Sequence, residues 1–166
     1  MNKKIITIFS LILFSTLMSS CFEDMTIRYD KAAQVEFEDA VRRAPAAGAI
    51  YPIISVTRTA GTQTLVANLI GQQLKTSEDM TVTVDTAIYK FLNATTIRAV
   101  EGTHFSLNGG KFTMKTDTSF AKYQFNIQNV TPVAGRSALV VLKLDGNNNI
   151  KPTESYRRVG YRIALQ

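Results

Sequence analysis

Two residue types that often carry out chemistry occur once each in this chain, as His104 and Cys21. A histidine-based metal cluster needs several imidazole ligands, so a single histidine excludes one. A nucleophile–histidine–acid relay would have to use His104, and the sequence has no GxSxG or CxxC motif to provide its nucleophile. We therefore predict no catalytic residue, and we interpret His104 as a side chain that holds a turn by a hydrogen bond.

Oxygen-bearing side chains offer a second kind of chemistry, calcium binding. The segment Asp145–Asn149, DGNNN, begins like an EF-hand loop, with oxygen ligands at the first, third and fifth places. Ile150 stands where that loop requires glycine, and Tyr156 stands where it requires a bidentate glutamate. Glu78 and Asp79 would add two carboxylates if they folded nearby. A polar turn is the favoured interpretation, and no metal ligand is predicted.

Cys21 follows a leader of the secretory type. The segment MNKK carries two lysines, and the apolar run of residues 5–18 is short for a membrane span, which needs about 18–20 residues. The order Met18, Ser19, Ser20, Cys21 resembles the bacterial lipobox, in which an aliphatic residue and two small residues precede the cysteine. We predict a cleaved signal peptide over residues 1–20 and lipidation of Cys21. An inert cysteine is the alternative, because no second cysteine is present to form a disulfide.

The residues after Cys21 suggest where in the cell the protein is located. Glu23 and Asp24 resemble the export signal by which Bacteroidetes-type lipoproteins reach the outer face of the outer membrane. Surface exposure is therefore expected, with a periplasm-facing anchor as the alternative, and residues 21–32 are interpreted as a lipidated tether. Loss of the leader removes two of 19 basic residues and none of 13 acidic ones, leaving a net charge of +4. This charge is too dispersed to indicate a nucleic-acid partner.

The rest of the chain, residues 33–166, shows the alternation of period two that is typical of half-buried strands. Asn108–Gly110 is predicted to be a hairpin turn, the Asp145–Asn149 segment a turn before the last strand, and Thr86–Leu92 a short helical turn. No long amphipathic helix and no internal repeat is evident. The pattern predicts one antiparallel, all-β sandwich of about eight strands. The expected strands lie at residues 35–37, 51–58, 65–69, 80–85, 111–114, 123–127, 140–144 and 159–165.

One short motif points to a family. The segment Ala99–Phe105, AVEGTHF, resembles the A-x-x-G-x-[DH]-[YF] signature of Calx-β-like immunoglobulin-fold domains. The resemblance implies that Gly102 permits a turn and that Phe105 points into the core. The chain is also similar to Bacteroidetes surface lipoproteins of unknown function that carry this domain after a lipobox. Such relatives are often encoded beside outer-membrane import receptors, which implies an accessory role in glycan uptake.

Sugar-binding proteins usually present exposed aromatic rings, and this chain has no tryptophan. Tyr51 and Tyr156 are the candidate ligand-binding residues because each adjoins a proline-bearing loop; the alternative is that they cap the sandwich. We therefore expect a non-enzymatic, membrane-anchored binding or accessory module whose partner is a glycan or an outer-membrane complex, without a cofactor. The alternative is a surface assembly or adhesion protein that pairs strand edges with a partner, and a small hydrolase is the least favoured class.

Overall fold

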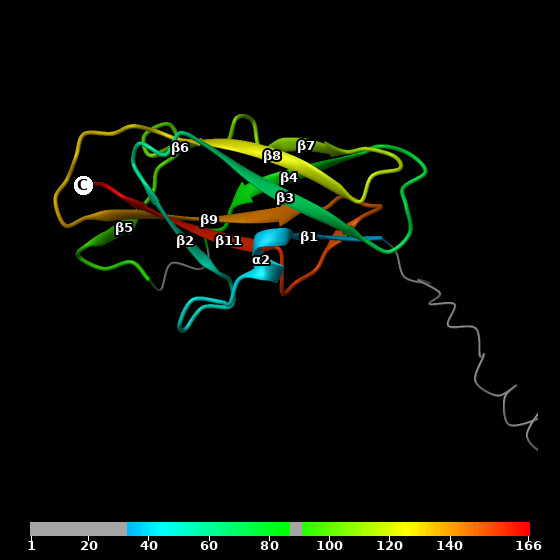
Figure 1. The fold of residues 1–166 in the computed structure, drawn as a ribbon, viewed down its shortest axis with the longest axis horizontal. Helices are drawn as coiled ribbons and strands as arrows, with labels where there is room; N and C mark the ends of the chain where they lie inside the picture. Colours follow the sequence, from blue (N-terminus) through cyan, green and yellow to red (C-terminus); the bar gives the residue numbers. More distant parts are fainter. Residues whose placement is uncertain (1–32, 87–90) are drawn as a thin grey trace, which may run out of the picture. The chain divides into compact units, whose positions relative to one another are not determined.

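The computed structural model describes residues 33–86 and 91–166, which belong to the compact unit Lys31–Gln166. The predicted signal peptide, Cys21 and most of the predicted helical turn lie outside the described residues. Two sheets pack face to face to form an all-β sandwich (Figure 1). Within the described ranges, no helix is long and apolar enough to cross a membrane.

The first sheet has five strands in the order β10-β1-β3-β8-β6. Its strands are β1 (Gln34–Phe37), β3 (Thr62–Ile70), β6 (Phe105–Ser106), β8 (Phe120–Ile127) and β10 (Lys151–Pro152). A short helix, α2 (Glu38–Arg42), follows β1 directly and lies beside β3. Its ion pairs Arg42–Glu38 and Arg43–Asp39 join residues four apart, the spacing that places side chains one above the other on a helix.

The second sheet has the order β2-β11-β9-β4-β7, and β5 also pairs with β9. Its strands are β2 (Ile53–Thr57), β4 (Glu78–Val84), β5 (Thr96–Arg98), β7 (Lys111–Met114), β9 (Ser137–Asp145) and β11 (Arg158–Ala164). Most pairings are antiparallel, as predicted. Three are parallel, β1 with β10, β2 with β11 and β5 with β9, because these strands are joined by long connections instead of tight turns.

Alternation produces the core. In β8 the residues Ala121, Tyr123, Phe125 and Ile127 are buried, while the even-numbered residues between them are exposed or half-buried. The Phe125 ring meets Tyr161 of β11 edge-on, with ring centroids 4.9 Å apart. This contact joins the two sheets through their facing sides.

The eight expected strands are present in the described residues, and three very short ones, β5, β6 and β10, were not predicted. The prediction of a hairpin at Asn108–Gly110 is wrong, because β6 pairs in the first sheet and β7 in the second. The turn therefore carries the chain from one sheet to the other. Gly110 has φ +65°, and a Cβ on it would lie 2.6 Å from the Val82 carbonyl oxygen, which explains why glycine is required there.

Candidate functional site

His104 has the structural role that the sequence suggests. The Val100 N–H donates a hydrogen bond to His104 Nδ1 at 3.0 Å, and the His104 N–H donates to the Val100 carbonyl at 2.8 Å. Partial burial lowers the pKa of the imidazole, which favours the neutral ring that can accept at Nδ1. Gly102 has φ +80°, and Phe105 is buried in the core, as the family resemblance implies. The predicted turn is confirmed.

The Asp145–Asn149 turn does lie beside Glu78, although 69 residues separate Glu78 from Asn147. Asn147 Oδ1 accepts the N–H groups of Asn149 and Ile150, both at 2.8 Å. These two bonds fix the side-chain amide so that its Nδ2 donates to Glu78 Oε2 at 2.8 Å and to the Asp79 carbonyl at 3.2 Å. Asn149 Nδ2 donates to the other Glu78 oxygen, Oε1, at 2.8 Å.

This arrangement does not suit a calcium ion. Calcium requires a shell of oxygen atoms, whereas Glu78 faces two amide N–H donors. The carboxylate of Asp145 is also engaged, since it accepts from Thr83 Oγ1 at 2.6 Å and lies 3.1 Å from Lys143 Nζ. Among the residues that the structure describes, no three histidine, cysteine or acidic side chains are grouped closely enough to hold a metal. The turn is closed by amides in place of a cation.

The two candidate tyrosines have different outcomes. Tyr51 is 0% exposed, so its ring cannot stack on a sugar, and its prediction as a ligand platform is wrong. The ring packs over Gly160 of β11, on the face of the second sheet that points away from the first; a Cβ on Gly160 would lie 3.3 Å from it. Tyr156 is 42% exposed in the turn before β11 and stays a predicted ligand-binding residue.

Among the described residues, the most exposed aromatic ring is that of Phe120, which begins β8 and is 56% exposed. It pairs with Asn68 of β3, and Lys122 pairs with Val66, so these four side chains lie together on the outer face of the five-stranded sheet. With Glu38 of α2 they line a depression of about 370 Å³, which we call the outer hollow. An aromatic ring is therefore surrounded by an amide, an ammonium group and a carboxylate.

A second depression adjoins the first around the sheet edge. This side hollow, of about 400 Å³, is lined by Phe120, Ala121 and Lys122 of β8 and by Thr113, Lys115 and Thr118 from β7 and the turn that follows it. Phe120 and Lys122 border both hollows. One ligand could therefore contact both depressions across the same ring.

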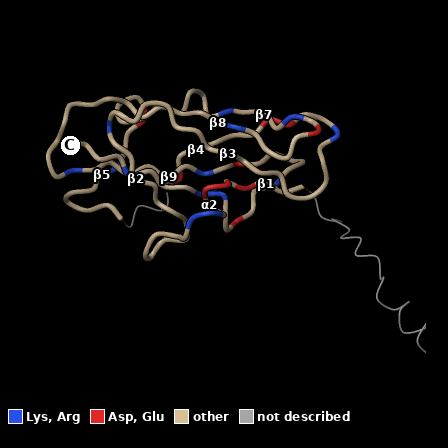
Figure 2. Tube along the Cα trace, viewed as in Figure 1, with Lys and Arg blue, Asp and Glu red and all other residues tan. Residues whose placement is uncertain are grey.

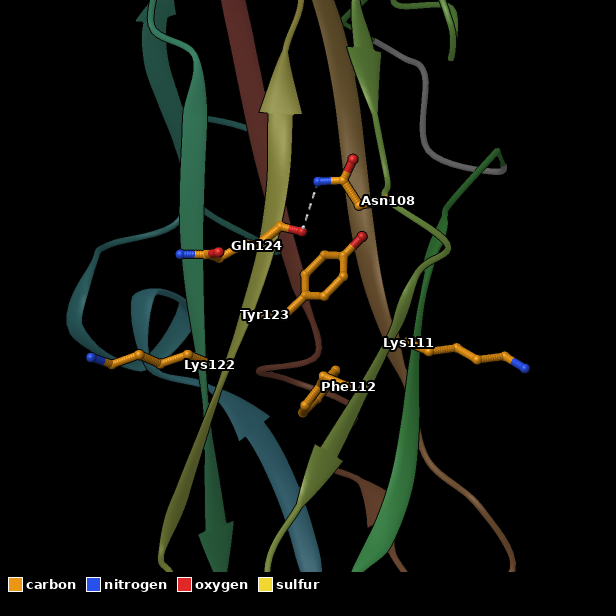
Figure 3. Close-up of a pocket in the computed structure, with 6 residues that line it drawn as sticks. All are labelled: Asn108, Lys111, Phe112, Lys122, Tyr123 and Gln124. Atoms are coloured by element: carbon orange, nitrogen blue, oxygen red, sulfur yellow. Dashed lines mark hydrogen bonds between the residues drawn. The ribbon is translucent and has the colours of Figure 1, made fainter.

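A third depression, of about 460 Å³, lies farther along the gap between β7 and β8 (Figure 3). The rings of Phe112 and Tyr123 fill the space between the two strands, whereas Lys111 and Lys122 point away to opposite sides. Burial raises the pKa of Tyr123 to about 12, and its hydroxyl donates to the Leu107 carbonyl. The Tyr123 hydroxyl is therefore neutral and hydrogen-bonded at neutral pH, and the charged side chains that line this depression are the two lysines, which point away from the gap.

The chemistry available at the two hollows around Phe120 is binding. Sugars stack their apolar faces on aromatic rings, and amide, ammonium and carboxylate groups hydrogen-bond their hydroxyls. Glycoside hydrolysis requires two carboxyl groups facing one bond. Among the side chains that line these hollows only Glu38 is acidic, and it is ion-paired with Arg42 at 2.9 Å.

Sequence reasoning missed Phe120. Its signal was available: Phe120 lies two residues before Lys122 in the outward-facing set of β8, where the other members are polar. A large aromatic side chain in the water-facing set of an amphipathic strand is the exception that indicates a binding surface.

Comparison with solved structures supports the fold. The chain superposes on the apo form of the Calx CBD1 domain with a TM-score of 0.56 and 11% identity, over 81% of this chain and 97% of that one. It matches the calcium binding domain CBD12 of CALX1.1 with a TM-score of 0.55 and 10% identity, over 79% of this chain and 44% of that one. A Bacteroides ovatus protein proposed to bind carbohydrate matches with a TM-score of 0.55 and 12% identity, over 80% and 37%.

These matches define the class of fold: the described domain is a Calx-β-like β-sandwich. The chain spans less than half the length of the second and third of these structures. No protein-family model and no curated protein matches the sequence.

Proposed function

We propose that this protein is a non-catalytic glycan-binding module whose ligand stacks on Phe120. The observation that carries the proposal is one half-exposed phenylalanine in a depression that Glu38, Asn68 and Lys122 also line, on a strand whose other outward-facing side chains are polar. The Bacteroides ovatus structure proposed to bind carbohydrate supports it, because a domain of the same fold forms part of that protein. The lipobox at Cys21 supports attachment to the outer membrane, where such a module would assist a glycan-uptake system.

The proposal is tested by titrating the mature protein with a panel of soluble polysaccharides in affinity electrophoresis and calorimetry. Phe120→Ala should reduce affinity at least tenfold, because it removes the whole stacking surface. Tyr156→Ala is the competing variant, since it also truncates a half-exposed aromatic ring and tests the remaining ligand-binding residue predicted from the sequence. Loss of binding in the Tyr156 variant alone would transfer the site to that turn.

Attachment is tested separately in cells. Cys21→Ser should leave the leader unprocessed by the lipoprotein route and keep the protein out of the outer-membrane fraction, because the acyl chains that would hold it there are absent. Protease treatment of intact cells then distinguishes a surface-facing anchor from a periplasm-facing one. Unchanged processing and partitioning of the Cys21 variant would contradict the lipid anchor.

A second candidate function, strand pairing with a partner protein, is favoured by the free edge of β8. Among the described residues, β6 covers β8 only at Asn126 and Ile127. The Gln128 N–H donates toward β6 and the Ile127 N–H toward β3, so alternation directs the Lys122 N–H to the uncovered side. Lys122→Pro would remove that donor and abolish capture of an edge-pairing partner, while Phe120→Ala would leave such capture intact.

A further inference from the structure

Two lysines lie beside Phe120 without an ion-pair partner among the described residues. Lys115 and Lys122 line the side hollow, and Lys122 also borders the outer hollow. Within residues 33–86 and 91–166, neither lysine forms an ion pair, whereas Arg42, Arg43 and Lys143 are each held by a carboxylate. The ammonium groups beside Phe120 are therefore available to a ligand.

The acidic groups near these lysines are already engaged or lie outside the hollows. Glu38, the only acid that lines them, is paired with Arg42. Asp79 of β4 accepts a hydrogen bond from Thr113 Oγ1 at 2.7 Å. Asp117, in the turn after β7, is not among the side chains that line the side hollow. Figure 2 shows acidic and basic positions interspersed around β7 and β8.

The donor set of the side hollow consists of its two lysines. Thr113 and Thr118 also line it, but their hydroxyl protons are already donated, that of Thr113 to Asp79 Oδ1 at 2.7 Å and that of Thr118 to the Lys115 carbonyl at 2.8 Å. Two ammonium groups beside an open depression match the needs of an anionic group, which carries several acceptor oxygens and no donor. A neutral sugar hydroxyl would leave the lysine charges without a counterpart.

We propose that the side hollow binds a carboxylate or sulfate group on the sugar unit next to the one stacked on Phe120, so that the ligand is an acidic oligosaccharide. This inference rests on the proposed glycan-binding function and specifies its ligand. Because Phe120 and Lys122 border both hollows, the ligand spans at least two sugar units, one in each depression.

The test compares matched ligands that differ only in charge. Tetragalacturonate is titrated against its carboxyl-reduced form, and a κ-carrageenan tetrasaccharide, whose only anionic groups are sulfates, against its desulfated form, which separates carboxylate from sulfate as the anionic group. The acidic member of one pair should bind about tenfold more tightly than its neutral counterpart, and the preference should shrink as salt is raised from 50 to 500 mM, because surface charges are screened.

Lysine variants test which side chain produces the preference for the acidic ligand. Lys115→Ala should weaken binding of the acidic ligand about fivefold and leave the neutral ligand unchanged, and Lys115→Arg should retain the preference. Lys151→Ala is the matched control and should change neither affinity. Lys151 lies on β10, at the edge of the five-stranded sheet opposite β6.

The outcomes separate the two proposals. Equal affinity for the acidic and neutral ligands, with both lost in Phe120→Ala, would overturn the acidic-ligand inference and support the binding site. Acidic ligands that bind equally well to Phe120→Ala and to the unmodified protein would overturn the shared site. If neither pair nor the wider polysaccharide panel binds, the glycan-binding function itself is refuted.

Discussion

The turn that joins Glu78 to Asn147 permits a sharp prediction. In Asn147→Asp the side-chain oxygen that accepts the Asn149 and Ile150 N–H groups is retained, but the amide that donates to Glu78 and to the Asp79 carbonyl becomes a second carboxylate oxygen. The variant therefore keeps the hydrogen bonds that shape the turn, but it replaces the attraction between residue 147 and Glu78 with repulsion. It tests whether amide donors hold this loop closed.

The magnitude follows from the contacts that change. Two hydrogen bonds are lost, each contributing about 1 kcal/mol net, and two negative charges are placed about 3 Å apart at a half-exposed site. Repulsion in such a solvated setting costs on the order of 1 kcal/mol. The free energy of unfolding should fall by about 2–3 kcal/mol, which for a domain of this size lowers the melting temperature by roughly 8 °C.

The assay is thermal unfolding followed by circular dichroism in chelator and in millimolar calcium. Asn148→Asp is the matched control, because it introduces the same charge at an exposed position of the same loop and should shift the melting temperature by 1 °C or less. The unmodified protein should melt at the same temperature with and without calcium. Calcium should recover part of the stability of Asn147→Asp, whose turn then presents carboxylates in place of a donor. An Asn147→Asp variant as stable as the control, or calcium stabilisation of the unmodified protein, would refute this account of the turn.

Three further predictions concern the framework around the site. Gly160→Ala should lower the free energy of unfolding by about 1–3 kcal/mol, because the new Cβ would lie 3.0 Å from Ile53 Cγ1 and 3.3 Å from the Tyr51 ring. Urea unfolding measures this loss. Adding Tyr51→Leu should restore part of the stability if the contact with the ring is responsible. Asp85→Ala should cost about 3 kcal/mol, because it leaves the buried Arg158 guanidinium without the carboxylate that lies 2.8 Å from its Nε, whereas Glu154→Ala, at the solvent-exposed side of the same arginine, should not change the urea midpoint. The pKa of His104 is below that of a free imidazole, so below about pH 6.5 the unfolded chain binds a proton more readily than the folded chain does. The free energy of unfolding should therefore fall as the pH is lowered from 7.5 to 5.5. His104→Asn should remove that part of the pH dependence, and an unchanged pH profile would contradict the role of the neutral ring.

The sequence was sufficient for the elements of the fold because alternation is a local property. Every second residue of β8 is buried, and β1 and β7 alternate in the same way, whereas β9 is buried on both faces over residues 138–142. The sheet to which each strand belongs is not local. The Asn108–Gly110 turn has the composition of a hairpin, yet it connects β6 and β7 in different sheets, because pairing is decided by strands distant in the chain.

The same limit applied to the candidate ligand residues. Tyr51 adjoins a proline-bearing loop and was expected to be exposed, but the outer face of the second sheet carries its own apolar layer, in which Tyr51, Leu139 and Val141 are fully buried. Tyr156 is exposed as expected. The sequence shows Phe120 as an aromatic residue among polar ones. Its use as a ligand-binding surface also depends on Asn68 and Glu38, which lie beside it only because β3 pairs with β8 and because α2 is close to β3.

The sequence by itself predicted the leader and the lipobox, and it determined the all-β class and the turn at His104, because each depends on neighbours within a few residues. Tertiary structure alone decided that amides of Asn147 and Asn149 face Glu78, that Tyr51 is buried, and that two lysines border an exposed ring. The physical reason is that a binding surface is made of side chains whose distances are fixed by sheet register and by the packing of one sheet on the other, and neither is written in any short stretch of the chain.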